Sequence, residues 1–242
     1  MKNQKRLILA LDGPGPEESV SLLKKLQKVI GICKVGPALF AAGGETLLRR
    51  IGDLGFELFL DLKFHDIPET VHRAVLEAAR PPVRFLTVHA LGGAGMLDRA
   101  VDAAREAAAH RSGERVRILA VTILTSLSSD DLERVGISKG VDTAVTALAK
   151  LACDRGVDGT VCSGREAARV RSACGADFLI LTPGIRPAKS PTDDQVRTVT
   201  PAEAIQQGAD FLIVGRPILA AGDPCRAARE IVSAIEAAVP PG

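Results

Sequence analysis

The chain has 242 residues, of which 46% are hydrophobic, and its 31 lysines and arginines nearly balance its 29 aspartates and glutamates, which leaves a net charge of +2. This length is ordinary for a single (β/α)8 barrel, which typically has about 250 residues, and the apolar content is enough for a large core. The sequence has no sustained basic run that could bind a phosphate backbone, and no Trp or Tyr that could stack on bases. We therefore expect no nucleic acid as a partner, and a small molecule as the ligand.

The first residues and the cysteines indicate a cytoplasmic protein. Residues 1–6 are polar and lead directly into an apolar run, which leaves no room for the hydrophobic region of a signal peptide. No apolar run approaches the length of a membrane span, so no membrane contact is expected. The five cysteines are an odd number without CxxC spacing, and we expect them to be small buried residues in a reducing compartment.

Short apolar runs rich in β-branched residues recur along the whole chain and predict β-strands. They lack polar alternation, which is typical of strands that are buried on both faces of a parallel sheet. Eight such runs occur, at residues 7–11, 30–35, 56–60, 85–88, 117–122, 159–162, 178–181 and 211–214.

Helical patterns lie between these strands. The first opens at Pro16 and places Val20 and Leu23 on one stripe, with Lys24 and Lys28 away from it. The longest loops are expected at residues 125–140 and 186–199, and loops of this length are often lids or binding loops. Further helices are expected at residues 69–79, 96–109, 141–154, 165–173, 201–207 and 224–238.

The unbroken alternation of strand and helix predicts an α/β fold, a single (β/α)8 TIM barrel. An open doubly wound sheet with an extra edge strand is the alternative. The sequence contains no linker and no low-complexity segment, so we expect one domain that covers residues 1–242.

Polar residues that would be costly inside a strand collect at the carboxyl ends of the predicted strands. In a parallel barrel all of these ends lie on one rim, where such folds build active sites. Single members have plainer explanations, such as a turn cap for Asp12 or a strand-end lysine that reaches solvent for Lys34, but their shared position favours a functional site. The residues are Asp12, Lys34, Asp61, Lys63, His89, Thr122, Arg186 and Arg216.

The segment 61–68, Asp-Leu-Lys-Phe-His-Asp-Ile-Pro, is the most informative part of the chain. It places two carboxylates and an ammonium within six residues at the end of an apolar strand. Because strand side chains alternate between faces, Asp61 and Lys63 are expected to point the same way. Opposite charges kept near a core indicate chemistry or a paired structural role, and a solvated turn with an ordinary surface ion pair is the alternative.

Two glycine-containing turns follow the last two predicted strands, at residues 182–186 (Thr-Pro-Gly-Ile-Arg) and 214–217 (Val-Gly-Arg-Pro). Barrels frequently hold phosphate at this position, with backbone N–H groups that glycine leaves accessible and with arginine as a bidentate donor. Either turn alone could be an ordinary connection. Together they predict a phosphorylated substrate.

Other motifs carry less weight. Residues 92–95 (Gly-Gly-Ala-Gly) lack the spacing of a dinucleotide fingerprint and are interpreted as a flexible helix entry. Ser163 lacks the flanking glycines of a nucleophile elbow and is interpreted as a helix cap. The four histidines show no metal-ligand spacing, so no metal is predicted, and His89 is expected to line the pocket.

Seven motifs, in order along the chain, resemble those of the orotidine 5′-phosphate decarboxylase family, specifically its bacterial group, and together they cover essentially the full length. The resemblance implies a homodimeric barrel with shared active sites that converts orotidine 5′-phosphate to UMP and CO2, the last step of pyrimidine nucleotide synthesis, with no metal or organic cofactor. The motifs are residues 9–12 (Leu-Ala-Leu-Asp), 34–36 (Lys-Val-Gly), 61–68, 124–126 (Leu-Thr-Ser), 182–186, 193–195 (Asp-Asp-Gln) and 214–216 (Val-Gly-Arg).

The resemblance also implies a role for each matching residue. Asp12 and Lys34 would contact the ribose hydroxyls, and Lys34 would join a charged tetrad. The tetrad consists of Lys34, Asp61, Lys63 and Asp66. Asp66 and Thr70 would enter the site from the partner subunit. The remaining residues would be Thr125 and Ser126 at the pyrimidine edge, and Arg186, Gln195, Gly215 and Arg216 at the phosphate and its closing loop.

The chemistry explains this charge pattern independently. Loss of CO2 from C6 of the pyrimidine leaves a carbanion in the ring plane that conjugation does not delocalise, so a preorganised cation is the expected stabiliser. Lys63 is predicted to offset that charge and then deliver the proton, while Asp61 and Asp66 hold its ammonium in place. Glu69 stands where many relatives carry an amide or another small polar residue, and we expect only a local change at that helix entry.

Two alternatives to this activity are open. A metal-dependent sugar-phosphate decarboxylase or aldolase of the same superfamily shares the Asp-x-Lys-x-x-Asp strand end, but an acidic metal ligand is expected there at the position of Lys34, and the lysine argues against Mg2+. A barrel that only binds a phosphorylated ligand would be favoured by the loss of a tetrad member, and all four members are present.

Overall fold

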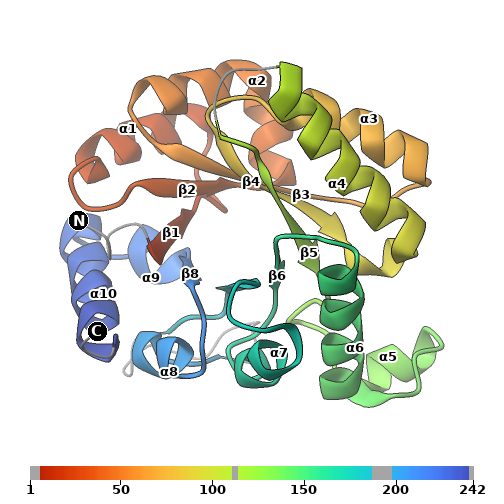
Figure 1. The fold of residues 1–242 in the computed structure, drawn as a ribbon. Helices are drawn as coiled ribbons and strands as arrows, with labels where there is room; N and C mark the ends of the chain where they lie inside the picture. The colour runs from red at the N-terminus through yellow and green to blue at the C-terminus, as the bar shows by residue number, and fades with distance from the viewer. Residues whose placement is uncertain (1–5, 111–113, 187–197, 240–242) are drawn as a thin grey trace.

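A closed barrel of parallel strands forms the centre of the molecule (Figure 1). The computed structural model describes residues 6–110, 114–186 and 198–239. Neighbouring strands pair in chain order, and Leu7 to Leu9 of the first strand align with Leu212 to Val214 of the last, which closes the sheet. The strands are β1 (Leu7–Ala10), β2 (Ile32–Val35), β3 (Glu57–Phe64), β4 (Val83–His89), β5 (Arg117–Val121), β6 (Gly159–Val161), β7 (Leu179–Thr182) and β8 (Phe211–Val214).

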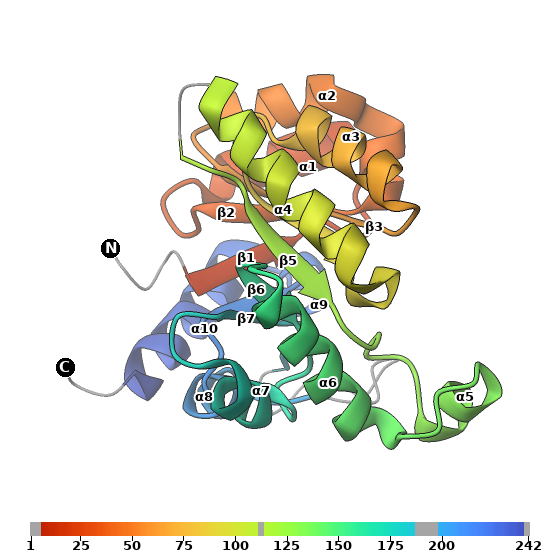
Figure 2. The ribbon, with the colours of Figure 1, turned by 45° about the vertical axis from the view of Figure 1, so that its right-hand side comes forward.

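Helices surround the barrel and cover the outer face of the sheet (Figure 1). Figure 2 shows that the short helix α5 stands away from the barrel, beyond the start of α6. The helices are α1 (Pro16–Leu26), α2 (Pro37–Asp53), α3 (Pro68–Ala78), the 3-10 helix η2 (Ala90–Gly92), α4 (Gly93–His110), α5 (Ser129–Arg134), α6 (Gly140–Asp154), α7 (Ala167–Cys174), α8 (Pro201–Gln206), α9 (Arg216–Leu219) and α10 (Pro224–Ala238). This architecture confirms the predicted (β/α)8 barrel, and the doubly wound alternative is wrong.

The apolar strands are buried on both faces because two hydrophobic layers enclose the sheet. The larger layer lies between the strands and the helices, and a smaller one fills the barrel interior. Three phenylalanines dominate the interior: the ring centroids of Phe59 and Phe85 are 6.1 Å apart, and those of Phe85 and Phe211 are 5.2 Å apart, both with edge-to-face geometry. This packing fills the barrel interior with apolar side chains.

Strand β3 is longer than predicted and includes the charged segment. The prediction ended at residue 60, whereas the strand continues to Phe64. Its register with β4 shifts between Leu60 and Phe64, which marks a bulge. The polar residues of this segment therefore extend the sheet rather than form a solvated turn.

Helix α2 was not among the predicted helices. It begins with Pro37 at its first position, after Gly36. Gly43 and Gly44 interrupt its helical pattern, and Gly44 has φ +54° inside the helix, so the two halves meet at a kink. Glycine adopts this conformation without the steric cost that other residues incur.

The two long predicted loops differ in outcome. The first, 125–140, contains α5, whose start is fixed by a capping box: the Asp131 N–H donates to Ser128 Oγ (3.2 Å) and the Ser128 N–H donates to the Asp131 carboxylate (3.0 Å). Most of the second, 186–199, lies outside the described residues.

The cysteine prediction is only partly right. Cys33 and Cys162 are buried, but Cys153, Cys174 and Cys225 are half-buried, because they lie on helices that also face solvent.

Among the described residues, we find no helix with both the length and the apolar character needed to cross a membrane.

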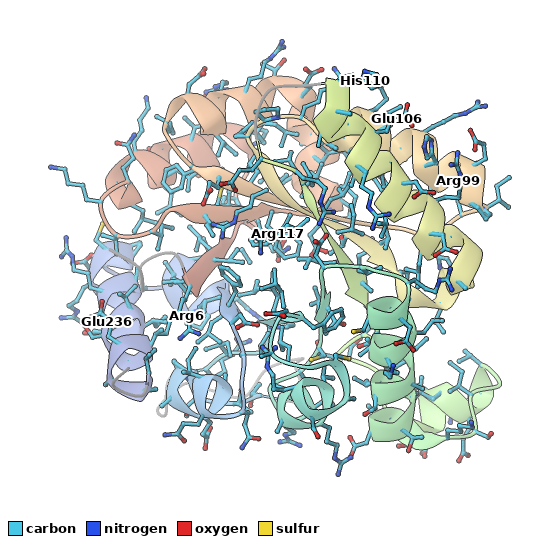
Figure 3. The ribbon with its side chains drawn as sticks, in the orientation of Figure 1. Arg6, Arg99, Glu106, His110, Arg117 and Glu236 are labelled. Atoms are coloured by element: carbon cyan, nitrogen blue, oxygen red, sulfur yellow. The ribbon has the colours of Figure 1, made fainter. Side chains whose placement is uncertain are left out.

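Polar contacts join α3 to α4, the helix after the next strand. Glu69 accepts hydrogen bonds from Arg99 (2.8 Å) on α4 and from Arg73 (3.2 Å) one turn along α3. His72 Nε2 lies 3.2 Å from the Glu106 carboxylate. Figure 3 labels Arg99 and Glu106 on the α4 ribbon. Glu69 therefore ties the first turn of α3 to its neighbour, a contact with no counterpart in the sequence-based expectation.

Candidate active site

A cavity of about 390 Å3 lies at the carboxyl ends of the strands, above the aromatic interior. Its polar lining comes from six different strands or the loops after them, so the barrel closure brings together residues that are far apart in sequence. Apolar side chains, among them Ile123, Val161 and Ile213, complete the wall. The predicted residues that line it are Asp12, Lys34, Asp61, Lys63, Thr125, Arg186, Gly215 and Arg216.

Alternating charges run along one side of this cavity. Lys34 Nζ lies 2.9 Å from Asp12 Oδ1 and 3.4 Å from Asp61 Oδ2. Lys63 Nζ lies 2.8 Å from the same Asp61 oxygen. The side chains of Lys34 and Asp61 are each 9% exposed, whereas that of Lys63 is 33% exposed. The Lys63 ammonium is therefore held by a buried carboxylate and still faces the cavity.

The surroundings of Asp61 keep its carboxylate ionised. Burial alone would raise the pKa of Asp61, but the ammoniums of Lys34 and Lys63, together with hydrogen bonds from Lys63 and Thr87, outweigh burial and lower the pKa below its ordinary value. A carboxylate in this state attracts the Lys63 ammonium over the whole neutral range.

Thr87, at the centre of β4, supports both residues from inside the barrel. Its hydroxyl donates to Asp61 Oδ1 (3.0 Å) and accepts from the Lys63 N–H (2.9 Å). The residue is fully buried. It does not line the cavity.

The backbone at Lys63 has a left-handed conformation, with φ +50°. It is the one non-glycine residue with positive φ in the described ranges 6–110, 114–186 and 198–239. This conformation is costly for a side chain with a Cβ, and such outliers gather at functional sites.

Gly36 allows Asp12 and Lys34 to approach each other at the end of β2. A Cβ at this position would lie 3.1 Å from Asp12 Oδ1 and 3.4 Å from Lys34 Nζ. A larger residue would therefore press on the pair that closes this side of the cavity.

The two predicted phosphate turns follow β7 and β8, and Gly215 in the second turn lies beside Ala10 of β1. Arg186 Nη1 donates to the carbonyl of Ile185 (2.9 Å), and Ile185 forms a bridge with Val199. Gly215 and Arg216 form the junction between β8 and α9. Gln195 lies outside the described residues.

Several predicted residues lie away from the cavity. Ser126 is exposed beside Thr125 and does not line it. Asp66 and Thr70 are exposed at the start of α3, and the Asp66 carboxylate accepts a hydrogen bond from the Ile67 N–H (2.6 Å). Thr122 is buried and donates to the Val161 carbonyl (3.4 Å).

The expectation that His89 lines the pocket is wrong. Its ring stacks on that of His65, with centroids 5.2 Å apart, and its Nδ1 accepts from the Leu91 N–H (3.4 Å). Burial, with smaller contributions from His65 and Lys63, lowers the pKa of His89, so its neutral form is favoured.

The two weaker motifs are structural. Helix α4 begins at Gly93, which agrees with a helix entry at residues 92–95. Ser163 Oγ accepts from the Arg165 N–H (3.3 Å), but the residue that caps α7 is Glu166, so Ser163 stabilises the preceding turn rather than the helix itself.

Sequence reasoning missed Thr87. The residue lies in the run Phe-Leu-Thr-Val. Because β-branched residues such as threonine are common in strands, this threonine gave no sign of a further role. The one available signal is its position in the strand. Thr87 lies two residues after Phe85 and two before His89, so the three side chains are expected on the same face of the strand. Since His89 was already predicted to lie at the rim, Thr87 could have been considered as a residue that supports the site.

Several known proteins resemble this chain over nearly its whole length. Orotidine 5′-phosphate decarboxylase from Syntrophotalea carbinolica is 47% identical to it, and the match covers 99% of this chain and 98% of the relative. Orotidine 5′-phosphate decarboxylase from Geobacter sulfurreducens is also 47% identical, and the match covers 97% of each chain. The crystal structure of orotidine 5′-phosphate decarboxylase from Lactobacillus acidophilus superposes with a TM-score of 0.84 at 37% identity and covers 96% of this chain and 99% of that chain. The model of the Orotidine 5′-phosphate decarboxylase / HUMPS family matches residues 5–231. The resemblance noted in the sequence is thereby confirmed, and the chain belongs to the Orotidine 5′-phosphate decarboxylase / HUMPS family.

Proposed function

We propose that the protein decarboxylates orotidine 5′-phosphate to UMP and CO2, as the last step of pyrimidine nucleotide synthesis, with neither a metal ion nor an organic cofactor. The observation that carries this proposal is the Lys63 ammonium, which is held 2.8 Å from a buried carboxylate and still faces the cavity. The names of its relatives, at 47% identity over nearly the whole chain, support the same substrate.

Lys63 supplies the charge that the reaction requires. When the bond between C6 and the carboxylate breaks, CO2 leaves and the electron pair stays on C6. The ammonium of Lys63 stabilises that pair, because it is already oriented before the bond breaks, and then transfers one proton to C6 to give UMP. Lys63 regains its proton from solvent after product release.

Asp61 orients the Lys63 ammonium, and Lys34 limits the cost of burying Asp61. Without a nearby cation, an ionised carboxylate that is 9% exposed would be strongly unfavourable. Crowding between Asp61 and the substrate carboxylate adds to the driving force only as a secondary effect, since stabilisation of the carbanion acts directly on the transition state.

The other predicted site residues bind the rest of the nucleotide. Asp12 and Lys34 contact the ribose hydroxyls, and Thr125 and Ser126 contact the pyrimidine edge. The phosphate lies at the turns after β7 and β8, where glycine leaves backbone N–H groups accessible and the side chains of Arg186 and Arg216 line the cavity. The phosphate-binding residues are Arg186, Gln195, Gly215 and Arg216.

We propose that the active unit is a homodimer with shared sites, in which Asp66 and Thr70 complete the site of the partner subunit. Residues 65–70 are exposed, and Ile67 exposes 67% of its surface, which is unusual for a large apolar side chain. The Asp66 carboxylate accepts a hydrogen bond from the Ile67 N–H, and within the described residues the ion-pair partner of Lys63 is Asp61. A second copy would cover this surface and bring Asp66 to the fourth position of the tetrad.

The alternative metal-dependent chemistry is disfavoured by the position of Lys34. Its ammonium lies between Asp12 and Asp61, at 2.9 Å and 3.4 Å, and neutralises the two carboxylates that a Mg2+ ion would need as ligands.

We propose a cytoplasmic location for the protein. The five cysteines all lie in the described part of the chain and are free thiols there, which is compatible with a reducing compartment.

The activity is tested by following the ultraviolet absorbance of orotidine 5′-phosphate with purified protein in excess EDTA. Loss of the substrate at an undiminished rate supports the proposal. No turnover, or turnover that EDTA abolishes and Mg2+ restores, contradicts it and favours the metal-dependent alternative.

The shared site is tested by mixing Lys63→Ala and Asp66→Ala proteins under conditions of verified subunit exchange. A two-fold mixed dimer has one site with both substitutions and one intact site. Random exchange of equal amounts makes half of the dimers mixed, so activity is expected to recover to about a quarter of that of the unmodified protein. No recovery places Asp66 in the same site as Lys63 of its own chain.

A further inference from the structure

The Thr87 hydroxyl is bonded to two parts of the site at once. It donates to Asp61 Oδ1 at 3.0 Å and accepts from the Lys63 N–H at 2.9 Å. A hydroxyl has one donor and two acceptor positions, so both bonds can form together. The residue is fully buried, and a buried hydroxyl is stable only when it is bonded.

The bond to Lys63 replaces a lost contact within the sheet. Where the register of β3 and β4 shifts, between Leu60 and Phe64, the regular pairing of the two strands is interrupted. The Lys63 N–H meets the Thr87 side chain there. Since the left-handed backbone of Lys63 is intrinsically unfavourable, it persists only where neighbouring groups hold it.

The bond to Asp61 fixes the rotation of the carboxylate. Oδ1 faces Thr87, which leaves Oδ2 toward Lys63 at 2.8 Å and Lys34 at 3.4 Å. Without the hydroxyl, Oδ1 would be a buried acceptor with no donor, and the carboxylate could rotate away from the two ammoniums. The same threonine thus controls the backbone of one residue and the side chain of its partner.

We propose that Thr87 is a positioning residue for the decarboxylation, which holds Lys63 and Asp61 in their reactive arrangement without contacting the substrate. The inference rests on the proposed function. Thr87 does not line the cavity, so its removal should alter the rate of the chemical step more than substrate binding.

The experiment compares Thr87→Val, which keeps the shape and removes the hydroxyl, with Thr87→Ser, which keeps the hydroxyl. Thr160→Val is the matched control: Thr160 is also a fully buried strand threonine, but its hydroxyl donates to the Ala120 carbonyl (2.8 Å), away from the cavity. Thr87→Ala is a second variant without the hydroxyl, in case valine prevents folding. Thermal unfolding establishes that each variant is folded at the assay temperature.

Thr87→Val is expected to lower kcat by about 10- to 100-fold, as for loss of a hydrogen bond to a charged group, with KM within about threefold of the original value. Thr87→Ser is expected to recover most of the rate. The pH profile gives a second readout: since a hydrogen bond from Thr87 is one of the interactions that lower the pKa of Asp61, the acid limb of kcat/KM should move to higher pH in Thr87→Val and not in Thr160→Val.

Equal kcat values for Thr87→Val and Thr160→Val would overturn the proposal, as would a loss in Thr87→Val that appears only in KM. Failure of Thr87→Ser to recover activity while folded would do the same. If the unmodified protein does not decarboxylate orotidine 5′-phosphate at all, the proposed function fails and the inference fails with it. An active unmodified protein with an unaffected Thr87→Val variant refutes the inference alone.

Discussion

Replacing Lys63 with alanine, and separately with glycine, distinguishes the loss of the ammonium from the strain of the backbone. Both variants lose the 2.8 Å pair with Asp61 and the proton donor. Both are therefore expected to lose kcat by several orders of magnitude, because an interaction that acts mainly in the transition state is removed. They should differ in stability, since only glycine adopts φ +50° without steric cost.

The size of this difference follows from two opposing effects. Glycine at an ordinary position is less stable than alanine by about 0.4–1 kcal/mol, because its unfolded chain has more conformational freedom. A left-handed backbone costs a residue with a Cβ about 1–2 kcal/mol. At Lys63 the second effect is larger, so Lys63→Gly should be more stable than Lys63→Ala by about 1 kcal/mol. For a chain of this length, that difference raises the unfolding temperature by about 2–4 °C.

The assay is thermal unfolding of the two variants under identical conditions, with the same pair of substitutions at Glu57 as the control. Glu57 opens the same strand without positive φ, and both of its variants lose the same 2.7 Å contact with Arg84. There alanine should be the more stable residue. A Lys63→Ala protein that is as stable as Lys63→Gly, or more stable, would refute the left-handed conformation and with it the strained geometry of the site.

Three further predictions concern the binding residues and the response to pH. Arg216→Ala should lower kcat/KM for the nucleotide, and the unphosphorylated nucleoside should be a very poor substrate for the unmodified protein, because phosphate binding energy orients the base; similar kcat/KM for nucleoside and nucleotide would exclude this assignment. Gly36→Ala should raise KM by about three- to tenfold, because the added Cβ would lie 3.1 Å from Asp12 Oδ1 and 3.4 Å from Lys34 Nζ and displace these side chains. An unchanged KM in steady-state kinetics would contradict a role of this pair in substrate binding. The pKa of Asp61 is lowered on folding from 3.8, so its ionised form stabilises the fold fully above pH 3.8, and this stabilisation is lost as the pH falls through the lower pKa of the folded state. The stability of Asp61→Asn should therefore fall less steeply on acidification than that of the unmodified protein. An identical pH dependence of the two proteins would contradict the pKa shift.

The fold was largely predictable because every strand contains an apolar run. Runs such as 7–11 and 211–214 can be buried on both faces only in a parallel sheet enclosed by helices. The limits of β3 were not predictable, since its charged end resembles a turn until the neighbouring strand is known. Helix α2 was missed because Gly43 and Gly44 break the pattern that identifies a helix, and the kink at Gly44 accommodates them.

The site was predictable to the extent that its residues stand at strand ends. Asp12, Lys34 and Lys63 share the rim because parallel strands all end there. Thr87 was not predictable, because its role depends on the register shift that brings the Lys63 N–H and the Asp61 carboxylate to one hydroxyl. No local pattern in the sequence indicates which strand will offer a side chain at such a bulge.

The central claim is that Lys63 stabilises the C6 carbanion and exchanges a proton with it. The most direct measurement is the exchange of the C6 hydrogen of UMP for deuterium in D2O, followed by proton NMR, because this reaction forms the same carbanion from the product without loss of CO2. The account predicts exchange with the unmodified protein and none above background with a folded Lys63→Ala protein. Exchange by Lys63→Ala at the rate of the unmodified protein would contradict it.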